Sequence, residues 1–117
     1  MNYISGFVVP VPDKEQHAYL AVAQKAWRLF KEYGALQQVE AWGDKVPDGK
    51  VTDFKRAVGL KDGETVVFSW VLWPDKATAD KCEAAMQTDA RWRQMDMPFD
   101  GKRMIMGGFE TVFEAKA

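Results

Sequence analysis

Glu40 and Trp42 are the side chains with the clearest potential for proton chemistry. They alternate along an extended segment, so both point to one face of the strand that the segment would form. If that face turned inward, a partly buried carboxylate beside an indole would have a raised pKa and could serve as a general base. If the strand lay at a sheet edge, Glu40 would be a solvated surface acid. Both interpretations stay open at this point.

A second pair, Asp100 and Arg103, flanks the start of the last extended segment. The two side chains could form an ion pair that fixes a turn, or Arg103 could present a cation to an anionic ligand. Trp70 suits either a core or an interface, or the wall of a cavity for a planar apolar ligand. We therefore predict a candidate pocket formed by Glu40, Trp42, Trp70, Asp100 and Arg103, and we assign no catalytic residue.

The single histidine and the single cysteine are expected to take no part in chemistry. His17 lies opposite the apolar stripe of its predicted helix, which favours a solvated position. Cys82 shares an apolar line with Met86, which favours a buried thiol that acts as a small hydrophobe. Neither a histidine-rich metal site nor a glycine-rich phosphate loop is present in the sequence. We therefore expect no cofactor and no metal.

The composition indicates one globular domain, residues 1–117, with 47% hydrophobic and 28% charged residues. Sixteen basic residues nearly balance 17 acidic ones, and the net charge of -1 argues against a nucleic-acid partner. One cysteine cannot form an internal disulfide. No segment approaches a membrane span and the N-terminus lacks a basic, apolar leader. We expect a cytoplasmic protein without a membrane partner.

The hydrophobic pattern predicts six main elements in the order β-α-β-β-α-β. The first helix begins at Asp13, which forms a capping box with Gln16, and ends at Gly34. The second helix begins at Pro74 and Asp75. Residues 91–101 are expected to be irregular, and Gly107-Gly108 indicates a bulge or a close backbone approach. Strands are predicted over Tyr3–Val11, Leu36–Gly43, Thr65–Trp73 and Arg103–Phe113, with a further short one over Phe54–Leu60.

This order is the split βαβ, ferredoxin-like arrangement, an α+β sandwich with an antiparallel sheet. Its first and third main strands are expected at the centre, with the second and fourth at the edges. Both faces of the central segment are apolar, since Val66, Phe68 and Trp70 alternate with Val67 and Val71. The face without helices therefore needs cover from water. We expect a second copy of the chain there, as a homodimer, whereas the alternative is a fold-over of residues 44–63.

Five segments of the sequence together carry a resemblance to a known family: Phe7–Pro12, Phe30–Leu36, Val46–Thr52, Val66–Trp70 and Met97–Ile105. They resemble the YbaA-like family, a bacterial family of unknown function. The resemblance implies the dimeric α/β-barrel type of ferredoxin-like fold, whose wider group includes cofactor-free monooxygenases, haem proteins and small isomerases. It brings no established reaction and no catalytic residues. Ala41 and Met106 depart from the family pattern, where Cys and an aromatic residue are common, and the stretch from 90 to 97 is shorter.

Two functions from different classes remain. The first is a dimeric module that binds a small apolar or aromatic molecule, or that serves as a scaffold. The second is a cofactor-free monooxygenase or isomerase acting on a small aromatic or carbonyl compound, with Glu40 or Arg103 as the polar group. A small-molecule ligand is a candidate partner under both hypotheses, and the motifs do not separate them.

Overall fold

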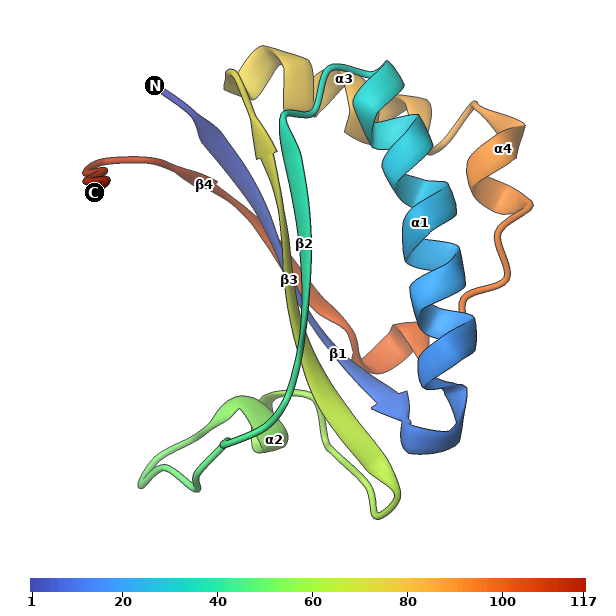
Figure 1. Ribbon diagram of the computed structural model, residues 1–117, viewed down its shortest axis with the longest axis vertical. Coiled ribbons are helices and arrows are strands. Elements are labelled where there is room, and N and C mark those ends of the chain that lie inside the picture. Colours follow the sequence, from blue (N-terminus) through green and yellow to red (C-terminus); the bar gives the residue numbers. More distant parts are fainter.

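The fold is a four-stranded antiparallel sheet with helices against one of its faces (Figure 1). The computed structural model describes residues 1–117. Three-residue 3-10 turns, η1 (Asp13–Glu15) and η2 (Gly101–Arg103), precede α1 and β4. The strands are β1 (Tyr3–Pro12), β2 (Gln37–Trp42), β3 (Glu64–Trp73) and β4 (Ile105–Glu110), and the helices are α1 (Gln16–Glu32), α2 (Phe54–Ala57), α3 (Lys76–Ala85) and α4 (Ala90–Arg93).

The strand order β2-β3-β1-β4 confirms the predicted α+β, ferredoxin-like topology. The central strands β1 and β3 pair over their full lengths, from Tyr3 opposite Trp73 to Pro12 opposite Glu64. The edge strands β2 and β4 pair with six residues each. The most apolar strand is thus at the centre, where both of its faces can be covered.

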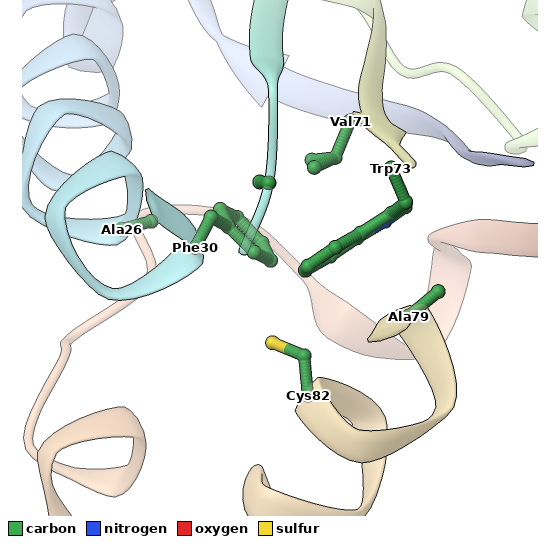
Figure 2. Packing of buried hydrophobic residues seen from close by; sticks show 7 residues of the cluster. Ala26, Phe30, Val71, Trp73, Ala79 and Cys82 are labelled. Carbon is green, nitrogen blue, oxygen red and sulfur yellow. The ribbon is translucent and has the colours of Figure 1, made fainter. Parts of the chain in front are cut away.

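The main core lies between the sheet and the helices (Figure 2). Ala26 and Phe30 of α1 face Val71 and Trp73 of β3, while α3 adds Ala79 and Cys82. The rings of Phe30 and Trp73 meet edge to face with centroids 6.0 Å apart. The Trp73 indole donates a hydrogen bond of 3.0 Å to Ser5 Oγ, so its polar atom is satisfied although the side chain is buried.

The ends of α1 differ in how well the sequence predicted them. Gly34 has φ +106 and stops the helix, as expected for a residue without a Cβ. The predicted capping box of Asp13 and Gln16 is wrong, because α1 has no side-chain cap at its N-terminus. The Asp13 carboxylate accepts a hydrogen bond of 2.5 Å from the Thr65 hydroxyl instead. The Asp13 carboxylate therefore bonds to the start of β3 and does not cap α1.

Residues 44–63 fold over one end of the sheet face that lies opposite α1 and α3. The predicted strand over Phe54–Leu60 is wrong, because this region forms the short helix α2. Asp53 favours the helix there, since its side chain accepts a hydrogen bond of 2.8 Å from the Arg56 amide. Val58, only 1% exposed, then packs on Val8 and Val66. The fold-over alternative therefore holds for that end of the face.

The remainder of this face, which we call the open face, is apolar and exposed. Phe68, Ile105 and Phe109 are exposed by 45%, 45% and 57%, respectively. The alternation predicted in β3 is confirmed, because Val67, Ser69, Val71 and Trp73 are buried on the helix side. No helix in the fold combines the length and the apolar character needed to cross a membrane.

Two segments near the C-terminus differ from their predictions. The stretch predicted as irregular contains α4, which Asp89 caps by accepting a hydrogen bond of 3.0 Å from the Arg91 amide. The last strand is shorter than predicted. Its register against β1 is unbroken, so Gly107 and Gly108 form no bulge. They mark a close approach instead, since a Cβ at Gly108 would overlap the Tyr3 phenol.

Candidate functional site

The site that best suits a ligand is a cavity of about 340 Å³ between the sheet and the helices, which we call the helix-side cavity. Its floor follows one row of side chains across all four strands: Glu40, Ser69, Phe7 and Met106, each opposite the next. Three inter-strand spacings of roughly 4.8 Å make this row about 14 Å long. One residue from every strand therefore contributes to the floor.

The walls of the cavity are mostly hydrophobic. The predicted apolar stripe of α1 forms one wall, with Tyr19 at its N-terminal end and Phe30 at its C-terminal end. Thirteen of the 17 lining residues are hydrophobic, so the cavity favours apolar surface over water. The opposite wall, from residues 86–106, supplies Met86, Trp92, Met97, Phe99, Met104 and Met106.

One end of the cavity is polar and hydrogen-bonded. The Tyr19 hydroxyl donates a hydrogen bond of 2.6 Å to Glu40 Oε1, and Gln38 Nε2 donates one of 3.0 Å to Glu40 Oε2. Burial raises the pKa of Tyr19 well above its usual range, and the negative charge and hydrogen bond of Glu40 add to this effect. A contact with Ser69 opposes it. The phenol therefore keeps its proton and remains a hydrogen-bond donor to Glu40.

The five predicted pocket residues do not form one site. Glu40 lines the helix-side cavity, and Trp42 lies on the same face of β2, where it packs against Val9, Val11, Tyr19 and Val67. Trp70 lies on the opposite face of the sheet, and its ring centroid is 5.5 Å from that of Phe68. The predicted pairing of Glu40 with an indole is thus present within one face, although Trp42 does not reach the cavity.

Asp100 and Arg103 form an ion pair with each other, and Arg103 also bonds to β3. The predicted ion pair is present, with Arg103 Nε 3.0 Å from Asp100 Oδ2. The Arg103 guanidinium also donates two hydrogen bonds of 2.7 Å to the Glu64 carboxylate, and this contact lowers the pKa of Glu64 to about 2. A further bond of 3.0 Å reaches the Gly59 carbonyl. Arg103 therefore ties η2 to the start of β3, with its donors engaged inside the protein.

The histidine and the cysteine lie where the sequence predicted. His17 is exposed on α1. Cys82 is fully buried, and its burial raises the thiol pKa to about 11, so the reactive thiolate is scarce at neutral pH.

Sequence reasoning missed most of the residues that make the cavity polar at one end. Tyr19, Gln38 and Ser69 are not among the candidate residues that the sequence singles out. The sequence does contain a signal for Gln38. It is two residues from Glu40, so the two side chains share one face of the strand. Met106 and the stretch from 90 to 97, where the sequence departs from the family pattern, both contribute to the cavity wall.

A second hollow adjoins the cavity and shares Ala23, Gln38 and Glu40 with its lining. An open groove of about 660 Å³ follows the exposed side between α1 and β2. It is lined mainly by polar residues, including Gln24 and Arg28, and it offers a ligand little enclosure. The helix-side cavity is therefore the better candidate site.

The fold defines a ferredoxin-like α+β protein with an apolar cavity beneath its first helix. A solved structure described as a dimeric ferredoxin-like protein from an uncultured marine organism has this fold. Its TM-score is 0.64 at 11% sequence identity, and the match covers 97% of this chain and 98% of that one.

The family follows from sequence comparisons. The model of the family of unknown function DUF1428 matches residues 2–101, and the chain belongs to that family. The uncharacterized protein YbaA of Escherichia coli (strain K12) is 51% identical over 116 residues, which cover 97% of this chain and 99% of YbaA. YbaA of Shigella flexneri matches to the same extent. The predicted resemblance to the YbaA-like family is confirmed.

Proposed function

We propose that this protein binds a small apolar or aromatic molecule in the helix-side cavity. The observation that carries the proposal is the combination of an apolar cavity of about 340 Å³ with a single polar end. Ligand sites in proteins are commonly of this size and combine hydrophobic walls with a few fixed polar groups. The four methionines in the lining add adaptability, because an unbranched thioether side chain fills irregular space at low cost.

A neutral, environment-sensitive naphthylamine dye tests this proposal. The wild-type protein should enhance the dye's fluorescence with a saturable, one-site profile. Val22→Phe introduces a ring into the cavity and should abolish the enhancement. Ala21→Phe introduces the same ring at an exposed position of α1 and should leave it unchanged. Thermal unfolding establishes that both variants fold. Equal dye binding by the two folded variants would place the ligand elsewhere and refute the proposal.

The open face is proposed to bind a second copy of the chain. Phe68, Ile105 and Phe109 each keep about half of their side-chain surface in water. Completing their burial would contribute about 1 kcal/mol per side chain. A stable interface covers about 800 Å² per partner, roughly a tenth of this chain's surface of 7964 Å². The similar solved structure is described as dimeric, which supports the same occupant here.

Sedimentation at low micromolar concentration tests the homodimer. Wild-type protein should sediment as a dimer, and Phe68→Asp should sediment as a folded monomer because it places a charge in the middle of the interface. Leu20→Asp changes a side chain of similar exposure on the outer side of α1 and should remain dimeric. A wild-type monomer at this concentration would end the proposal. A dimer that persists in Phe68→Asp would place the interface elsewhere.

The Glu40 carboxylate favours a second candidate function, a cofactor-free isomerase or monooxygenase for a small aromatic or carbonyl compound. Glu40 reaches the cavity with Tyr19 held against one oxygen, so a carboxylate base adjoins a largely apolar space. In this function the carboxylate would take the proton from a carbon next to a carbonyl group and return it after the bonds rearrange.

Deuterium exchange into β-tetralone, a neutral two-ring ketone, tests the proton transfer. In heavy water the wild-type protein should speed deuterium incorporation next to the carbonyl, as followed by NMR. Glu40→Gln should remove the acceleration while retaining ligand binding. No acceleration by the wild type, or undiminished acceleration by Glu40→Gln, would rule out Glu40 as the base.

A further inference from the structure

We propose that the helix-side cavity selects a neutral aromatic molecule with a hydrogen-bond donor at one end and a carbonyl-type acceptor at the other. This inference rests on the proposed binding function and specifies its ligand class. It follows from two buried polar atoms without a partner, Gln38 Oε1 and Trp92 Nε1, because both belong to residues that line this cavity. The third such atom, the Thr111 hydroxyl, is not part of the lining.

Gln38 offers an unused acceptor. Its amide nitrogen donates to the Ala23 carbonyl at 3.3 Å and to Glu40 Oε2 at 3.0 Å. Both partners are acceptors, so the reversed amide would place oxygen against oxygen, and the orientation is determined. The amide oxygen is therefore left buried without a donor. A buried acceptor without a donor is unfavourable, and a ligand hydroxyl or N–H group would satisfy it.

Trp92 offers an unused donor. Its ring packs on Phe30 with centroids 4.9 Å apart, which holds the indole within the cavity wall. An indole N–H can only donate, and here it has no acceptor. In Figure 1, α1 lies between β2, which carries Gln38, and α4, which carries Trp92. The two unsatisfied atoms therefore belong to different elements that both line the cavity, which suits a ligand with two separate polar groups.

The charge of the lining excludes anionic ligands. Glu40 is its one charged side chain, and no lysine, arginine or histidine is present among the lining residues. A carboxylate or phosphate group in this cavity would lose its hydration and meet a like charge without a compensating cation. The walls otherwise present aromatic rings and methionines, which favour a flat apolar framework.

Four probes of similar size test the inference by calorimetric titration in mildly acidic buffer. Umbelliferone is a neutral two-ring molecule with a hydroxyl at one end and a carbonyl at the other. Coumarin lacks the hydroxyl, naphthol lacks the carbonyl, and naphthoate carries a carboxylate. Umbelliferone should bind about three- to tenfold more tightly than coumarin or naphthol, the range expected for one hydrogen bond. Naphthoate should bind most weakly.

Variants then assign each polar group to its partner. Trp92→Phe removes the N–H donor together with part of the indole ring, so all probes should lose some contact area. Umbelliferone and coumarin should weaken by about a further three- to tenfold relative to naphthol. Gln38→Met removes the acceptor together with the donor to Glu40, and it should weaken umbelliferone and naphthol relative to coumarin. The matched controls, Trp27→Phe and Gln37→Met, lie outside the cavity lining and should leave all affinities unchanged.

The possible outcomes separate this inference from the proposed function. If all neutral probes bind equally and Trp92→Phe weakens all of them to the same extent, the polar selection is refuted and the apolar binding site stands. If naphthoate binds as tightly as umbelliferone, the exclusion of anions is refuted. If no probe binds and none displaces the naphthylamine dye, both this inference and the proposed function are refuted.

Discussion

The contact between Arg103 and Glu64 should make an unusually large and pH-dependent contribution to stability. Their side chains are only 20% and 10% exposed, and two parallel hydrogen bonds of 2.7 Å join them. The pKa of Glu64 falls from 4.5 to about 2, mainly because of the hydrogen bonds from Arg103. At 1.36 kcal/mol per pKa unit this corresponds to at most about 3 kcal/mol. Water at the rim of the contact screens it, so we expect Glu64→Gln to lose about 2 kcal/mol at neutral pH.

The sign of the pH dependence follows from the lowered pKa. The unfolded chain takes up the proton near pH 4.5, whereas the folded chain resists until about pH 2. The stabilisation is therefore complete above pH 4.5 and is lost as the pH falls toward 2. The difference between wild type and Glu64→Gln should shrink over the same interval, because the variant has no carboxyl group to protonate there.

Urea unfolding at a series of pH values, at one fixed protein concentration, measures this difference. Asp80→Asn is the matched control, since Asp80 forms an exposed pair with Lys76 at 2.7 Å. Its effect should be small at every pH because solvent screens an exposed pair. A Glu64→Gln effect that stays constant from neutral pH to pH 2 would show that shape or packing, and not the charged contact, is responsible.

Three further results are expected. In an alkaline spectrophotometric titration, one of the three tyrosines should resist ionisation until the protein unfolds, because the pKa of Tyr19 is raised. Tyr19→Phe should remove this late ionisation step. The raised pKa of Tyr19 gives stability that is lost above about pH 10. Cys82 should react with Ellman's reagent only upon unfolding, and rapid reaction of the native protein would contradict its burial and its pKa of about 11. Gly34→Ala should cost about 1–2 kcal/mol in backbone strain, plus the overlap of its Cβ with Thr78 Cγ2 at 2.7 Å, as measured by urea unfolding. Gly63→Ala has a positive φ but free space around it, so it should show the strain alone.

The sequence predicted the sheet well because its strands carry strong local signals. The β-branched run around Val67 and Val71 and the stop at Gly34 lie where tertiary contacts agree with local preference. It misassigned Phe54–Leu60, where a short apolar run suits either a strand or a helical turn and the cap at Asp53 decides between them.

The cavity was harder to foresee. Because β3 is apolar on both faces, alternation could not reveal which face the helices cover, and Trp70 was grouped with Glu40 although they lie on opposite sides of the sheet. The role of Tyr19 depends on a contact with Glu40, 21 residues away, which no local pattern encodes.

The outer wall of the cavity is made from the most weakly held part of the chain. Neither α4, η2 nor β4 contains a fully buried residue, and β4 is an edge strand attached to β1 alone. The middle of the floor, Phe7 and Ser69, belongs by contrast to the paired central strands. Segments with so little buried surface open at a small fraction of the free energy of global unfolding. Under the proposed binding function, a ligand would thus enter and leave by transient detachment of this border, while β1, β3 and α1 keep their shape.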